Sequence, residues 1–101
     1  MLKAVFRMNG NDFCGFRISG HAGYGAAGND IVCAAVSSCT MLVCNAVTES
    51  FKARADVNVG ENLISLTLRE DNSAVSKLIE ALYEHLKAIS EDYSKVKVEI
   101  D

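Results

Sequence analysis

The stretch that organises this chain is Gly20-His21-Ala22-Gly23-Tyr24-Gly25-Ala26-Ala27-Gly28-Asn29-Asp30-Ile31-Val32-Cys33. Four glycines precede an apolar run, which predicts a loop followed by a helix that begins near Ile31. Asn29 or Asp30 is the expected N-cap, because a side-chain oxygen at that position can accept a bond from a free helical N–H group. The thiol of Cys33 therefore falls in the first turn of a helix.

The residues before this stretch predict a β-hairpin. Residues 2–8 alternate between apolar and polar side chains, which is the period of a half-buried strand. Asn9-Gly10 is a strong hairpin-turn signal. Residues 13–19 alternate again, and we expect Cys14, Phe16 and Ile18 to share the buried face.

The residues after the stretch predict two helices and three strands. The first helix should run from Ile31 to about Phe51, and because it is apolar on nearly every side we expect more than one side to be buried, one of them in a subunit contact. Residues 57–59 and 63–69 read as strands. Residues 71–73 cap an amphipathic helix, and we expect His85 to be partly buried at the boundary of its apolar stripe. Residues 95–100 form a last strand.

The predicted fold is a single α+β domain over residues 1–101. Its order is ββαββαβ, with an antiparallel or mixed sheet of about five strands and two helices. Half of the residues are hydrophobic, which suits a packed core.

Charge and composition narrow the classes of partner. The net charge is −3 and no Lys/Arg block is present, so we expect no direct contact with nucleic acid. Polar residues interrupt the apolar run from Ile31 to Val47, so we expect no membrane span. The N-terminus lacks an apolar signal region, and four cysteines without an export signal are typical of reduced thiols in the cytoplasm.

The pairing of Cys33 with His21 predicts nucleophilic catalysis. Free N–H groups and the helix dipole favour the thiolate, and His21 can fold back across the loop to act as its base. The same N–H groups are the expected donors to an oxyanion. Ser37, one turn after Cys33, could support the site or simply bond to the helix backbone. Asp30 could orient His21, cap the helix, or do both.

Other interpretations of these residues remain open. Cys33 could be a small buried residue and His21 an ordinary loop residue. Residues 23–28 match G-x-G-x-x-G, the outline of a dinucleotide site, but they follow a hairpin and no acidic residue ends a following strand. Tyr24 could close over a substrate or pack the loop down. Cysteine spacing predicts no metal site, and no cofactor is expected.

The motif resembles the ribosomal-processing cysteine protease family, Prp. The shared pattern is G-H-A, a short glycine-rich loop, and then G-x-D-I-V-C-A-A-V-S, which this chain carries from Gly20 to Ser37. The resemblance implies that Cys33 is the nucleophile and His21 the general base, with Asp30 and Ser37 in supporting roles. It also implies a substrate loop that includes Gly20, Ala22, Gly23, Tyr24, Gly25 and Gly28.

The resemblance further implies a substrate. By this resemblance we expect a cytoplasmic homodimer that removes an N-terminal extension from large ribosomal subunit protein twenty-seven. The recognised peptide is short and hydrophobic, with aromatic residues before the cut. The alternative from a different class is a non-catalytic, ribosome-associated module whose loop binds a peptide or a phosphate.

Overall fold

The computed structural model describes residues 1–23 and 30–101 of the chain. Its elements are β1 (Leu2–Asn9), β2 (Asp12–Gly20), α1 (Ile31–Asn45), the π-helical turn η1 (Ala46–Ser50), β3 (Ala55–Gly60), β4 (Leu63–Leu68), α2 (Ser73–Asp92) and β5 (Val96–Ile100). This is the ββαββαβ order that the sequence predicts, except that the first long helix ends in a π-helical turn.

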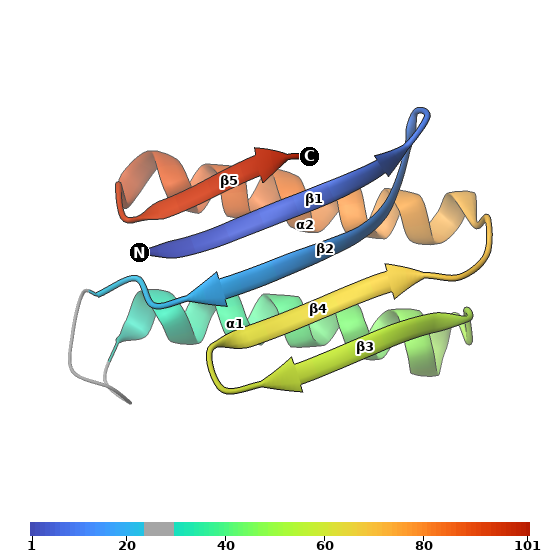
Figure 1. The fold of residues 1–101 in the computed structure, drawn as a ribbon, viewed down its shortest axis with the longest axis horizontal. Coiled ribbons are helices and arrows are strands. Elements are labelled where there is room, and N and C mark those ends of the chain that lie inside the picture. The colour runs from blue at the N-terminus through green and yellow to red at the C-terminus, as the bar shows by residue number, and fades with distance from the viewer. Residues whose placement is uncertain (24–29) are drawn as a thin grey trace.

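The strands of the described residues form one five-stranded sheet in the order β3-β4-β2-β1-β5. β1 and β5 run parallel, and the other neighbouring pairs run antiparallel. Figure 1 shows α1 and α2 on the same side of the strands, so the molecule has two layers and one face of the sheet carries no helix. The α+β class with a mixed sheet is confirmed.

The core lies between the sheet and the two helices. The alternation predicted for β1 places Leu2, Ala4 and Phe6 inward, all fully or almost fully buried. Phe6 packs against the rings of Phe16 and Tyr83, with ring centroids 5.8 and 5.3 Å apart. Such aromatic pairs add about 0.5–1.5 kcal/mol each beyond the burial of their area. This cluster anchors α2 to the centre of the sheet.

The apolar stripe of α2 also follows its predicted spacing. Val75, Ile79, Leu82 and Leu86 are buried. His85 is exposed, however, and the expectation that it would be partly buried is wrong. It lies roughly 90° around the helix from the centre of the stripe, which turns its ring away from the sheet.

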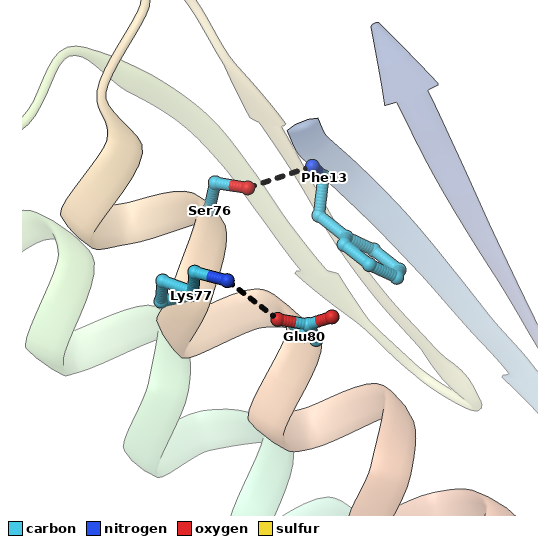
Figure 2. Close-up of polar contacts among 4 residues, drawn as sticks. All are labelled: Phe13, Ser76, Lys77 and Glu80. Atoms are coloured by element: carbon cyan, nitrogen blue, oxygen red, sulfur yellow. Dashed lines mark hydrogen bonds and ion pairs between the residues drawn. The ribbon is translucent and has the colours of Figure 1, made fainter. Parts of the chain in front are cut away.

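A β-bulge interrupts the hairpin near its turn. Arg7 pairs with Gly15 and Met8 pairs with Phe13, so one residue of β2 has no partner on β1. The backbone N–H of Phe13 donates instead to Oγ of Ser76 on α2, at 2.8 Å. Figure 2 shows this bond joining the two layers, with the exposed Lys77–Glu80 ion pair directly after Ser76 along α2. Loss of a buried acceptor of this kind costs about 1–3 kcal/mol.

The bulge corrects the prediction for Cys14. Cys14 is the extra residue of the bulge and is half-buried, while Phe13 takes the inward position at 6% exposure. An inserted residue shifts the alternation by one, so Phe13 and Phe16 both face the core although their numbers differ in parity. A simple period of two does not predict this shift.

The first long helix is buried on one side. Its inward residues include Val36, Val43 and Cys44. On the opposite side Ile31 is 75% exposed and Leu42 is 69% exposed. We define the outer face of α1 as the exposed residues Ile31, Ala34, Ala35, Ser38 and Leu42. The sequence predicts that this second side is also buried, but in one copy of the chain it is exposed.

Within the described part of the chain, one helix passes a test for membrane spans based on length and composition. This helix is Ile31–Ser50, with a mean hydropathy of 1.9. The polar residues of this helix are expected to make it too polar to cross a membrane. By length and composition alone, that expectation is wrong. Core helices of soluble proteins pass the same test, and this helix contributes Val36 and Val47 to the core, so the result is weak evidence for a membrane.

Candidate active site

The thiol of Cys33 and the imidazole of His21 lie together where β2 ends and α1 begins. The distance from Cys33 Sγ to His21 Nδ1 is 3.8 Å. His21 directly follows the last residue of β2 and is exposed, whereas Cys33 is half-buried in the first turn of α1. The structure thus brings together the two residues on which the sequence interpretation depends.

Asp30 is the N-cap of α1. Its Oδ1 atom accepts the backbone N–H groups of Val32 and Cys33, each at 3.0 Å, and the side chain is 9% exposed. Of the two roles proposed for Asp30, capping is the one these bonds support. The amides of Val32 and Cys33, two of those expected as oxyanion donors, are therefore bonded to Asp30 in this structure.

A different amide faces the sulfur. The N–H of Ala22 donates to Cys33 Sγ at 3.1 Å. Ala22 has no exposed surface and sits between Gly20 and Gly23, whose φ angles are +89° and +78°. Residues other than glycine rarely adopt such angles, so the sharp turn on both sides of His21-Ala22 depends on these two glycines.

The same turn is packed closely against two other segments. A Cβ atom on Gly20 would lie 2.2 Å from the backbone oxygen of Met1. The N–H of Gly20 donates to the backbone oxygen of Asn62, at 3.0 Å, in the turn between β3 and β4. On the other side, Lys95 Nζ lies 3.4 Å from the backbone oxygen of Gly23. The turn is therefore packed against the N-terminus and bonded to the β3–β4 turn and to the side chain of Lys95, the residue before β5.

A pocket of about 290 Å³ opens beside the thiol. One wall is a stripe of α1 formed by Cys33, Ser37 and Met41, at intervals of four residues. The other walls come from the ends of the strands, and the full lining is Leu2, Ile18, Gly20, His21, Cys33, Ser37, Met41, Val59, Gly60, Asn62, Leu63 and Ile64. The pocket is mostly apolar in character, and its polar lining residues are His21, Cys33, Ser37 and Asn62.

The structure places the sequence-predicted site residues as follows. Cys33, His21, Ser37 and Gly20 line the pocket. Tyr24, Gly25 and Gly28, together with the G-x-G-x-x-G match, lie outside the described residues except at Gly23. The sequence interpretation missed the strand-derived wall, including Val59 and Leu63, because only the pairing of β4 with β2 brings it beside the helix.

The other described thiols near α1 are less available for chemistry. Burial raises the pKa of the Cys44 thiol to about 11 and also raises the pKa of Cys39. The S–H group of Cys39 donates to the backbone oxygen of Val36 at 3.3 Å. In the described ranges 1–23 and 30–101, no group of three His, Cys, Asp or Glu residues could hold a metal ion.

Comparison with known families identifies the class of chemistry. The family described as cysteine protease Prp matches residues 1–98. The chain belongs to the cysteine protease Prp family. As a Prp cysteine protease the chain is an enzyme, so the alternative of a non-catalytic binding module is not supported. The family match spans both the site and the sheet that holds it.

Several solved structures share this fold. Two structures of the essential ribosomal processing protease Prp from S. aureus cover 100% of both chains. The one with a covalently linked product peptide has a TM-score of 0.93 at 22% identity, and the one with a substrate peptide has a TM-score of 0.86 at 21% identity. SMU.848 from Streptococcus mutans has a TM-score of 0.81 at 25% identity, over 100% of this chain and 96% of that one. No curated protein sequence matches this chain.

Proposed function

We propose that this Prp protein is an endopeptidase in which Cys33 is the nucleophile and His21 the general base. The observation that carries the proposal is the 3.8 Å approach of Cys33 Sγ to His21 Nδ1 at the mouth of an apolar pocket. A thiol beside an imidazole is the arrangement of a cysteine hydrolase. The cysteine protease class of the family fits the same pair.

The proposed reaction has two halves. His21 Nδ1 takes the thiol proton and Sγ attacks the scissile carbonyl carbon. The carbonyl then re-forms as the C–N bond breaks, and the leaving amine takes the proton from His21. In the second half His21 removes a proton from water, the hydroxide attacks the thioester, and the carboxylic acid leaves as Sγ recovers its proton. Ser37 lies in the pocket one turn from Cys33, where its hydroxyl can bond to the bound peptide.

The proposed substrate is the N-terminal extension of large ribosomal subunit protein twenty-seven, processed in the cytoplasm. Three points support it: the resemblance of Gly20–Ser37 to the family motif, the family match, and the ribosomal processing role of the S. aureus protease. Side chains such as Leu2, Met41 and Val59 give the pocket apolar walls that suit a hydrophobic peptide.

Mass spectrometry of the cleaved substrate tests this proposal. The wild-type protein, Cys33→Ala and His21→Ala are each incubated with a peptide that copies the N-terminus of that ribosomal protein. Wild type should release the extension, and both variants should lose cleavage while keeping the circular dichroism of the folded protein. Cys39→Ala is the matched control and should retain activity. Cleavage by folded Cys33→Ala would refute the assignment of the nucleophile.

We also propose that the active form is a homodimer in which the outer faces of α1 meet. This face is self-complementary: two large residues, Ile31 and Leu42, flank the small residues Ala34, Ala35 and Ser38. In an antiparallel pair, Ile31 of one copy faces Leu42 of the other, and Ala35 faces Ser38. Small residues at the centre allow close approach, and a two-fold axis gives both copies the same contact.

A further inference from the structure

The amide of Ala22 is placed to do more than hold the resting thiol. It donates to Cys33 Sγ at 3.1 Å, whereas the helix amides of Val32 and Cys33 are bonded to Asp30 Oδ1. A reaction at Sγ creates negative charge on the former carbonyl oxygen and needs a donor for it. Among the amides just described, only that of Ala22 is directed at the reacting atom.

The fold holds this amide in a fixed position. The Ala22 side chain is fully buried in the core, and the glycines on either side of His21-Ala22, Gly20 and Gly23, turn the backbone with positive φ angles. Gly20 is bonded to Asn62 and Gly23 contacts Lys95. A donor that is already oriented needs no reorganisation when charge develops, which is the main source of oxyanion stabilisation.

We propose that the backbone N–H of Ala22 is the oxyanion donor of this enzyme. The inference rests on the proposed role of Cys33 as nucleophile. When the Sγ–C bond forms, the π electron pair of the carbonyl moves to its oxygen. That oxygen lies two bonds from Sγ, and the Ala22 nitrogen lies 3.1 Å from Sγ. The nitrogen can therefore come within about 2.7–3.1 Å of the oxyanion, the distance that a hydrogen bond to it requires. The N–H bond moves from sulfur to oxygen on attack and returns when the C–N bond breaks.

Semisynthesis can remove this one hydrogen, because Cys33 is itself a natural ligation point. A synthetic peptide of residues 1–32 with a C-terminal thioester is joined to recombinant residues 33–101. An ester in place of the amide between His21 and Ala22 deletes the N–H and keeps every side chain. The matched control carries its ester between Gly10 and Asn11, in the exposed turn at the other end of the β1–β2 hairpin, and the all-amide product is the reference.

The His21–Ala22 ester should lower kcat by about 10²-fold or more, with little change in KM. Affinity for a peptide aldehyde, whose thiol adduct carries an oxygen in the same position, should fall by a similar factor. Affinity for the cleaved product peptide, which binds without a covalent bond, should stay unchanged. A merely structural role of the amide would weaken all three together. The Gly10–Asn11 ester should behave as the all-amide protein does.

Two results would overturn the inference. One is a His21–Ala22 ester with the kcat and aldehyde affinity of the all-amide protein. The other is an ester that slows alkylation of Cys33 while leaving kcat unchanged, which would limit the amide to the resting thiol. If the folded all-amide and recombinant proteins both fail to cleave the peptide, the proposed function itself fails, and the inference fails with it.

Discussion

Gly20 is the residue on which the backbone of the site depends most directly. A Cβ atom there would lie 2.2 Å from the Met1 oxygen, and the φ angle of +89° is unfavourable for any other residue. We therefore expect Gly20→Ala to lower the free energy of unfolding by about 2 kcal/mol or more, and to abolish cleavage by displacing His21. Urea denaturation and the peptide cleavage assay measure the two effects.

Gly60→Ala is the matched control for stability. Gly60 has an ordinary φ angle, and a Cβ atom added there would have no atom within 4 Å. Its free energy of unfolding should change by less than about 0.5 kcal/mol. Equal stability of the two variants would contradict the close packing described at Gly20.

The thiols are expected to differ in their reactivity with pH. With a pKa of about 11, Cys44 is a thiolate in only about one molecule in a thousand at pH 8, and its alkylation should rise tenfold for each pH unit up to that pKa. Cys33 opens into the pocket and its sulfur accepts an N–H bond, so iodoacetamide should label it first at neutral pH. Peptide mapping by mass spectrometry assigns each label, and Cys33→Ala should lack the fast phase. Faster labelling of Cys44 would contradict this order.

The role of a single residue can be predicted from the sequence when it depends only on residues nearby in the chain. Asp30 is predictable as a cap because capping needs only a short acceptor before a helix. Cys14 is misplaced because a bulge changes the side-chain direction without changing the residue types. The predicted cap implies that the Asp30 side chain accepts bonds from helical amides. Only the bond distances show that the amides it occupies are those of Val32 and Cys33.

The start of α1 is the element that positions Cys33. Asp30→Ala removes the acceptor of two helical N–H groups and should destabilise the protein by about 0.5–2 kcal/mol. Asp30→Asn keeps an oxygen in the same place, so it should retain most of both stability and cleavage. Thermal unfolding and the cleavage assay measure these outcomes.

The asparagine variant separates the two roles considered for Asp30. If Asp30→Asn folds with native stability but loses cleavage, the carboxylate charge acts on His21 or the substrate, and capping alone is insufficient. Retained activity would limit Asp30 to placing the helix. Ser90→Ala is the control. It removes an exposed hydrogen bond on α2, from Ser90 Oγ to the backbone oxygen of Lys87, and so tests the loss of a local side-chain bond away from the site.

Helices and strands whose apolar residues recur at regular spacing are well predicted, but the residues at which they end are not. α2 follows its apolar stripe because burial against the sheet and helical spacing agree. The predicted helix from Ile31 to Phe51 changes to a π-helical turn after Asn45, where the Phe51 N–H bonds to the oxygen of Ala46. That change depends on how the last turn packs, which the spacing of apolar residues does not encode.

At the scale of the whole molecule, the pocket is a product of topology. β4 pairs with β2 so that Leu63 lies opposite Ser19, and this brings the β3–β4 turn beside Gly20. Figure 1 shows that turn and the start of α1 at the same end of the sheet. Residues more than twenty-five positions after Cys33 thus form a wall of its pocket. A single sequence predicts the strands but not their order, so it predicts the thiol and imidazole and not the surface that receives the peptide.

The homodimer is the prediction that belongs to this scale. In one copy, Ile31 and Leu42 are 75% and 69% exposed although they lie on an otherwise apolar helix. The wild-type protein should have a mass of twice 10.9 kDa by light scattering. Leu42→Lys places two charges against apolar side chains of the opposite copy and should shift the protein to a monomer, because unpaired charges are costly to bury. Ala88→Lys, on the exposed side of α2, should remain dimeric. A monomeric wild type would refute the dimer, and a dimeric Leu42→Lys would move the contact to another surface.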